Sequence, residues 1–96
     1  MTIREFQQLI ERTYYERDAR RGLALTFAWF VEEVGELARG IVRPGHAALE
    51  GEFADVLAWL ATLASLHGID LERAAAAKYG AGCPRCGGAP CRCAPA

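Results

Sequence analysis

Apolar residues recur every three or four positions along most of the chain, which is the period of an amphipathic α-helix. Four such segments are separated by turn-forming residues. The predicted helices are at about residues 3–18, 24–42, 47–67 and 70–79. Thr2 and Glu5 predict a capping box at the first helix, Gly68 ends the third, and Asp70 caps the fourth. Glycine and proline dominate from Gly80 onward, so the pattern predicts an all-α fold with an irregular tail.

The second predicted helix carries an apolar stripe on one face and acids on the opposite face. The stripe consists of Phe27, Phe30, Val31, Val34, Leu37, Ala38 and Ile41. This is the ordinary pattern of a surface helix that turns one face toward a core. The acids of this helix therefore need no functional explanation by themselves.

The third predicted helix is apolar or small nearly all round, which predicts burial between its own chain and a partner. Its larger apolar flank is formed by Phe53, Leu57 and Leu60. Glu52 and Asp55 nevertheless lie on this helix, and buried carboxylates are costly unless they are paired or bound to a metal.

Five carboxylates thus fall in two short windows with helical spacing. They are Glu32, Glu33 and Glu36 in the second helix, and Glu52 and Asp55 in the third. Residues three or four apart project to a common side, so two helices could build an oxygen cage of the kind that Mg²⁺ prefers. The alternative is a structural network of ion pairs with Arg39, Arg43 or Lys78. We favour the cage, because the acids outnumber the nearby bases.

Length and composition describe one small globular domain. The 96 residues are 52% hydrophobic and 24% charged, and a chain this short needs oligomerisation or a metal to supplement its core. Outside the two acidic windows the chain has seven acidic and eleven basic residues. This small excess of positive charge does not predict binding to nucleic acid. The basic stretch at residues 17–22 is predicted to form the end of the first helix and the turn after it, with solvated surface favoured over contact with phosphate. No signal peptide or transmembrane segment is evident, so we expect a cytoplasmic protein.

All four cysteines crowd into the tail, as Cys83, Cys86, Cys91 and Cys93. In a reducing compartment such clustering favours a metal over disulfides. A structural Cys₄ Zn²⁺ site is the favoured interpretation, with redox or disulfide chemistry second and an iron–sulfur centre third. We expect a helical domain at residues 1–80 and a zinc-knuckle-like tail at residues 81–96.

The paired acidic motif resembles that of a known family. Glu-Glu-x-x-Glu at residues 32–36 is followed, after fifteen residues, by Glu-x-x-Asp at residues 52–55. Over about residues 3–80 the chain resembles the MazG-like nucleoside triphosphate pyrophosphohydrolases of the all-α NTP pyrophosphatase superfamily. The resemblance implies a four-helix bundle completed by dimerisation, as a homodimer or a dimer of dimers.

The resemblance also implies a chemistry, which is Mg²⁺-dependent or Mn²⁺-dependent cleavage between the α and β phosphates of a nucleotide. Carried over by position, Glu33, Glu36, Glu52 and Asp55 would be the metal ligands, and Glu32 or Glu33 would activate the water. Phe6, Tyr14 or Trp29 would stack on the base unless they are plain core residues, and Lys78 would meet a phosphate or complement its helix dipole.

Two alternatives remain at this stage. The same fold could act on phosphoribosyl-ATP or on deoxynucleoside diphosphates. The chain could instead be a non-catalytic helical oligomer that uses its cysteine tail as an interaction module.

Overall fold

The computed structural model describes residues 1–43, 45 and 48–95. Over these residues it contains four helices and no strand: α1 (Ile3–Arg21), α2 (Leu23–Val42), α3 (Leu49–Leu66) and α4 (Leu71–Tyr79). The predicted all-α class and the order of four helices are confirmed. Within the described ranges no single helix is long and apolar enough to cross a membrane, and only α3 and α4 together, across a 96° bend, meet that test.

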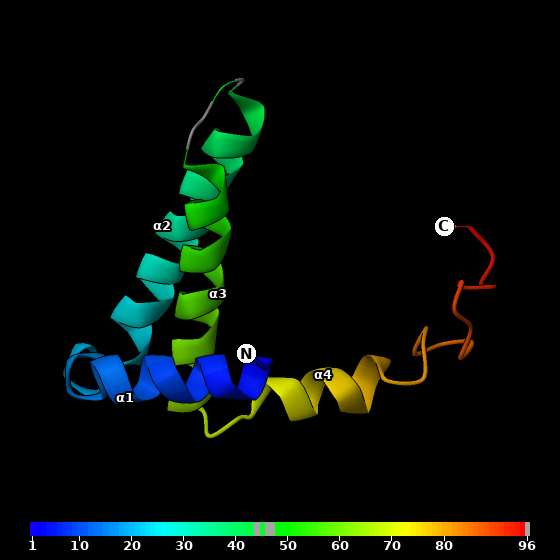
Figure 1. Ribbon diagram of the computed structural model, residues 1–96, viewed down its shortest axis with the longest axis horizontal. Helices are drawn as coiled ribbons and strands as arrows, with labels where there is room; N and C mark the ends of the chain where they lie inside the picture. The colour runs from blue at the N-terminus through cyan, green and yellow to red at the C-terminus, as the bar shows by residue number, and fades with distance from the viewer. Residues whose placement is uncertain (44, 46–47, 96) are drawn as a thin grey trace.

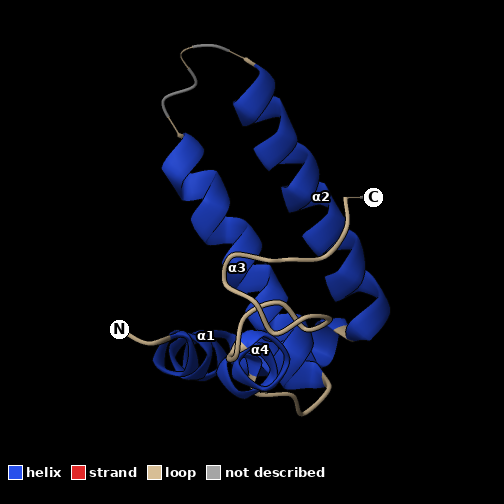
Figure 2. Ribbon diagram, turned by 90° about the vertical axis from the view of Figure 1, so that its right-hand side faces the viewer, coloured by secondary structure: helices blue, strands red, loops and turns tan. Residues whose placement is uncertain are grey.

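The helices α2 and α3 form a long hairpin, and α1 crosses its lower end (Figure 1). Helix α4 continues beyond α1, away from the hairpin, and leads into the cysteine tail. A view turned by 90° shows α1 and α4 nearly end-on at the foot of the hairpin (Figure 2). The hairpin therefore presents one side above α1 that α4 does not cover.

The helix ends follow the local signals, with one correction. The capping box of Thr2 and Glu5 is present, and the Asp70 side chain accepts the N–H of Arg73. The first helix does not end near residue 18 as expected but runs to Arg21, where Gly22 breaks it at φ 82°. The basic residues up to Arg21 are therefore helical and do not form a turn. Their positive charges complement the dipole at the C-terminal end of the helix. The expected start of the third helix, at residue 47, lies outside the described residues.

The interior of the single chain is small and partly polar. Among the described residues, the only buried hydrophobic residues of the core are Ala61 and Ala64 of α3. The buried polar side chains are Gln7, Asp18, Thr26 and Thr62. Both buried apolar residues of α3 are therefore small alanines in its C-terminal half, whereas Ala54 in its N-terminal half is exposed.

The apolar stripe of α2 does not lie in the core as expected. Phe30 and Leu37 are half-buried, but Phe27, Val31, Val34 and Ile41 are exposed. The reason is that α3 and the end of α1 cover only part of α2. The stripe is therefore a surface of the single chain.

Candidate metal and nucleotide site

Three of the predicted carboxylates converge in the hairpin. Glu33 of α2 and Glu52 and Asp55 of α3 each offer an oxygen, and these oxygens all lie within 4.8 Å of one another. The spacing of Glu52 and Asp55 puts them on one side of α3, and the pairing of α2 with α3 brings Glu33 across to them. Two helices thus contribute to one acidic site.

The electrostatics of Glu33 show a surplus of negative charge. Burial raises the pKa of the Glu33 carboxyl, and the charges of Asp55, Glu52, Glu36 and Glu32 raise it further, in that order. A bound divalent cation would remove this repulsion, and carboxylate oxygens are the donors that a hard cation prefers. The donor set therefore fits Mg²⁺ or Mn²⁺.

The other two predicted acids lie at the edge of this site. The Glu36 carboxylate accepts an ion pair from Arg39 at 3.2 Å, and both side chains are well exposed to solvent. Glu32 is exposed on α2 and acts on Glu33 through its charge. All five predicted carboxylates therefore share one electrostatic environment, although only three converge tightly.

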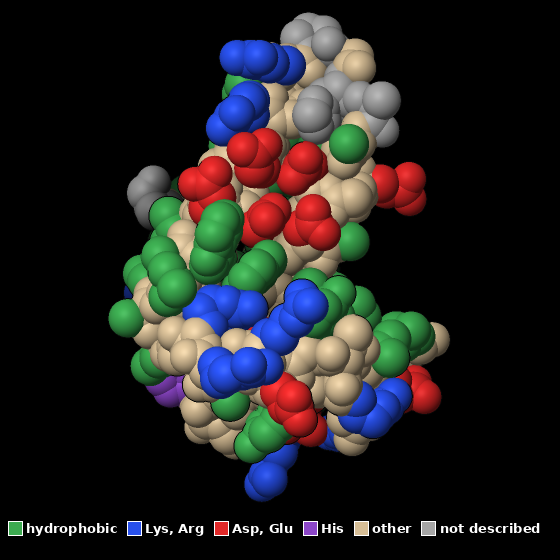
Figure 3. Space-filling model, turned by 90° about the vertical axis from the view of Figure 1, so that its left-hand side faces the viewer, with side chains coloured by type: hydrophobic (Ala, Val, Ile, Leu, Met, Phe, Trp, Pro, Cys, Tyr) green, Lys and Arg blue, Asp and Glu red, His purple; other side chains and the backbone are tan. Residues whose placement is uncertain are grey.

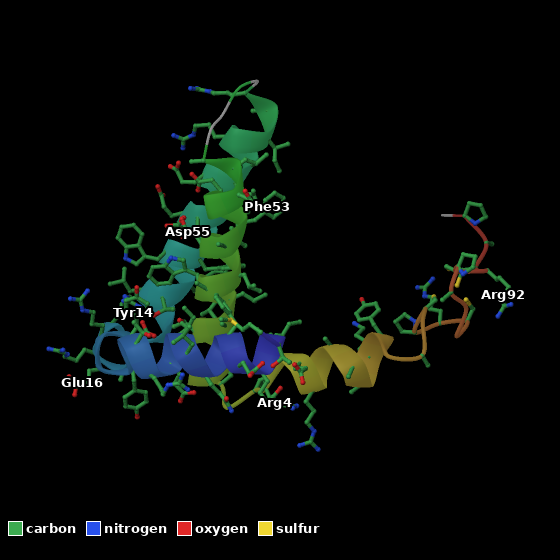
Figure 4. The ribbon with its side chains drawn as sticks, in the orientation of Figure 1. Arg4, Tyr14, Glu16, Phe53, Asp55 and Arg92 are labelled. Carbon is green, nitrogen blue, oxygen red and sulfur yellow. The ribbon has the colours of Figure 1, made fainter. Side chains whose placement is uncertain are left out.

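A pocket of about 280 Å³ lies beside the acidic site, between α1 and α3. Asp55 lines it on the acidic side, Tyr14 and Trp59 provide aromatic walls, and Arg17 and Arg21 provide positive charge. On the corresponding face of the molecule, acidic side chains gather above a group of basic side chains (Figure 3). Tyr14 and Asp55 lie on the same side of the molecule (Figure 4). Aromatic, cationic and carboxylate groups thus surround one opening.

Arg21 is held in this pocket by a buried partner. Its Nη1 lies 2.9 Å from Asp18 Oδ1, and Thr62 Oγ1 donates to Asp18 Oδ2 at 3.3 Å. The guanidinium lies 4.8 Å from the centre of the Trp59 ring, within cation–π range. The arginine is therefore fixed in position before any ligand binds.

The comparison with known families supports the acidic motif. The family model of the MazG nucleotide pyrophosphohydrolase domain matches residues 21–86, which is more than half of the chain. The chain belongs to this family. Among curated proteins, none matches the chain significantly. The MazG match includes both acidic windows but not residues 3–20 of α1, so Tyr14, Arg17 and Asp18 are features outside the matched segment.

Only one of the four residues expected to contact a nucleotide in this MazG chain lines the pocket. Tyr14 lines the pocket directly. Trp29 stacks on Trp59 with ring centres 6.3 Å apart, so it supports the aromatic wall. Phe6 is half-buried in α1 and is not among the residues that line the pocket. The Lys78 ammonium lies 5.6 Å from the Tyr79 ring on α4, which extends away from the hairpin.

Several pocket residues were not predicted from the sequence. Trp59 follows Asp55 by four residues, so helical spacing puts it on the same side of α3, and this spacing is the signal for it in the sequence. The basic run contains Arg17 and Arg21, but we favoured solvated surface there. That interpretation is wrong for Arg21, which is half-buried in contact with Asp18 and Trp59.

The cysteine tail forms a second cluster of potential metal ligands. The sulfurs of Cys83, Cys86, Cys91 and Cys93 all lie within 4.8 Å of one another. This tail follows α4 and lies away from the acidic site (Figure 1). The molecule thus has two separate clusters with chemically different donors.

Proposed function

We propose that the chain is a Mg²⁺-dependent pyrophosphohydrolase that cleaves nucleoside triphosphates between the α and β phosphates. The products would be a nucleoside monophosphate and pyrophosphate, and the role would be control of the cytoplasmic nucleotide pool. The observation that supports this most strongly is the convergence of Glu33, Glu52 and Asp55 beside an arginine and aromatic pocket in a MazG chain.

The carboxylates of the acidic site would have two roles, as metal ligands and as a general base. Glu33, Glu52 and Asp55 would hold the cation, with Glu36 completing the set from the edge. When bound, Mg²⁺ or Mn²⁺ supplies neutralising charge to phosphate oxygens and orients the reacting groups. Glu32 is the proposed acceptor of the proton from the attacking water, because it lies next to the converged carboxylates without being one of them.

The pocket beside the site would hold the nucleotide. Arg21, and Arg17 near it, would neutralise phosphate charge, since a guanidinium matches phosphate geometry. Tyr14 offers a ring face on which a base can stack, and Trp59, which already contacts Trp29 and Arg21, supports this wall of the pocket. The fixed pairing of Arg21 with Asp18 reduces the entropy lost on binding.

The active form is proposed to be a homo-oligomer built from two-chain units. The exposed apolar side chains on α2 and α3 include Phe27, Val31, Phe53, Leu57 and Leu60. A second copy that covered them would supply the core that one chain of this size lacks. The acidic site could stay open, because Phe53 and Asp55 lie on opposite sides of α3 (Figure 4).

The function is tested by incubating the protein with each nucleoside triphosphate and Mg²⁺ or Mn²⁺, and measuring monophosphate and pyrophosphate. Deoxynucleoside triphosphates, deoxynucleoside diphosphates and phosphoribosyl-ATP complete the panel and define the substrate. We expect metal-dependent pyrophosphate release from at least one triphosphate. Release of orthophosphate alone, or no turnover of any substrate, would contradict the proposed reaction.

Variants of the acidic site give a sharper test. Glu33→Gln and Asp55→Asn should each lower kcat/KM by about 100-fold or more, since a catalytic cation contributes several kcal/mol. Both should also weaken Mn²⁺ binding measured by electron paramagnetic resonance. Glu32→Gln should lose turnover but keep Mn²⁺. The matched control is Glu50→Gln, which changes an exposed acid in the first turn of α3. Full activity in Glu33→Gln and Asp55→Asn would contradict the assignment.

A further inference from the structure

The four tail sulfurs are arranged as the corners of a compact tetrahedron. The Sγ atoms of Cys83 and Cys91 are 3.6 Å apart, those of Cys83 and Cys93 are 3.7 Å apart, and those of Cys86 and Cys91 are 4.0 Å apart. Four thiolates at about 2.3 Å from one Zn²⁺ are about 3.8 Å from one another in a regular tetrahedron. The observed separations therefore match one ion with four sulfur ligands.

Other cysteine chemistry fits these distances less well. Bonded disulfide sulfurs are about 2.05 Å apart, and all four cysteines are free. A cluster of several irons spreads its thiolates around a larger body than a single ion. Zn²⁺ and a single iron remain, and Zn²⁺ is the usual occupant of structural Cys₄ sites.

Two backbone hydrogen bonds close the turn that carries Cys83 and Cys86. Cys83 N–H donates to Gly88 O at 2.9 Å, and Gly87 N–H donates to Cys83 O at 2.7 Å. Gly87 adopts φ 70°, a conformation that other residues rarely take. A side chain at Gly88 would meet Pro90 O at 2.6 Å, so only glycine fits there. The glycines thus permit the turn that brings the first two sulfurs together.

Backbone N–H groups point at the sulfurs, as they do toward negatively charged acceptors. Cys86 Sγ accepts from Arg92 N–H at 3.2 Å and from Gly88 N–H at 3.4 Å. Hydrogen bonds of this kind favour the thiolate form of cysteine, which is the form that ligates a metal ion.

We propose that Cys83, Cys86, Cys91 and Cys93 bind one structural Zn²⁺, in a site separate from the acidic site. Four thiols would release four protons to the solvent, and Zn²⁺ would form four Zn–S bonds, with no change of oxidation state. The resulting site carries a net charge of −2, and the exposed Arg85 and Arg92 lie within the same segment to offset it. The segment has no apolar core of its own, so the ion would hold its fold.

Metal analysis tests this proposal directly. The full chain, purified under reducing conditions without added zinc, should contain about one zinc per chain. Replacing zinc with Co²⁺ should produce the thiolate charge-transfer and d–d absorption bands of a tetrahedral sulfur site. Iron in place of zinc, or disulfides found by mass spectrometry, would overturn the proposal. So would metal-free protein with four freely reactive thiols that takes up no Zn²⁺.

Two variants separate the tail from the rest of the molecule. The double variant Cys86→Ser/Cys91→Ser should lose the zinc, while the helical signal in circular dichroism persists. The matched control, Arg85→Ser, changes an exposed residue of the same segment and should keep the zinc. Glu33→Gln should also keep it, which separates failure of this site from failure of the proposed catalysis. Zinc retained in the double variant would overturn the assignment.

Discussion

Asp18 is a charged residue whose position only the folded structure explains. The residue is 7% exposed, and its carboxylate is paired with Arg21 and hydrogen-bonded to Thr62, which lies 44 residues away in the sequence. A buried carboxylate is tolerated only with such partners. Asp18 therefore joins the end of α1 to α3 and also fixes the arginine that faces the pocket.

Removing this carboxylate should destabilise the fold. We expect Asp18→Ala to lower the free energy of unfolding by about 2 kcal/mol, because hydrogen bonds to charged groups contribute about 1.5–3 kcal/mol. Urea denaturation followed by circular dichroism measures this. Glu16→Ala is the matched control, since it makes the same kind of change at an exposed position of α1. Equal stability of the two variants would contradict the structural role of Asp18.

At the residue scale, the sequence predicted the acidic site better than the pocket. Glu52 and Asp55 stand three residues apart in one helix, and the hairpin of α2 and α3 brings Glu33 beside them. Asp18 and Thr62 meet only through the crossing of α1 over α3. Nothing in local spacing encodes that crossing, so the contact between Asp18 and Thr62 could not be predicted from the sequence.

Helix α4 is attached to α1 by polar contacts near its start. Arg4 pairs with Asp70 at 2.7 Å and with Glu72 at 3.1 Å. Gln7 donates to Ile69 O at 2.8 Å and accepts from Leu71 N–H at 2.9 Å. The direction of α4, and with it the place of the cysteine tail, therefore depends on a few bonds near the N-terminus (Figure 4).

The link between Arg4 and Asp70 should make stability depend on pH. The Arg4 side chain, together with the N–H of Arg73, lowers the pKa of Asp70 below its usual value. A lowered folded-state pKa means that the stabilisation is present above the unfolded value of about 4 and is lost as pH falls through the folded value. The stability difference between the unmodified chain and Asp70→Asn should therefore be largest above about pH 5 and shrink in acid.

This pH dependence is measured by urea denaturation of both chains between about pH 2.5 and 7. Asparagine still caps a helix, so the variant isolates the ion pair from the cap. Glu16→Gln, which removes an exposed carboxylate of α1, should differ little from the unmodified chain at every pH. A difference for Asp70→Asn that stays constant or grows in acid would contradict the role of the ion pair.

At the element scale, the ends of helices were predictable where the signal is local. The capping box at Thr2 and the cap at Asp70 each join residues only three positions apart, and both are confirmed. The end of α1 was misjudged, because a run of arginines is equally compatible with a surface turn and with a last helical turn. Gly22 at φ 82° marks the end, and its conformation is visible only in the fold.

The whole chain leaves much of its apolar surface uncovered. Phe27 of α2 and Phe53 of α3 are each 56% exposed, although α2 was predicted to face a core and α3 to be buried between its own chain and a partner. The periodicity correctly marked these residues as a face but could not say whether the chain itself or another copy covers it. Only two hydrophobic residues in the described part of the chain are buried, which is a small core for 96 residues.

Association through this face should be visible in solution. Light scattering coupled to size exclusion should give at least twice the chain mass of 10.5 kDa, and Phe53→Glu should shift the protein toward the monomer. A charge buried at an apolar contact is strongly unfavourable, whereas Phe53 in a lone chain is already exposed to water. The matched control is Tyr79→Glu at the end of α4, where the residue is 60% exposed and lies away from the hairpin.

Because the acidic site lies on the opposite side of α3, Phe53→Glu should reduce turnover only as far as it reduces assembly, so activity should recover at high protein concentration. A chain that is monomeric at every concentration and fully active would contradict the oligomer.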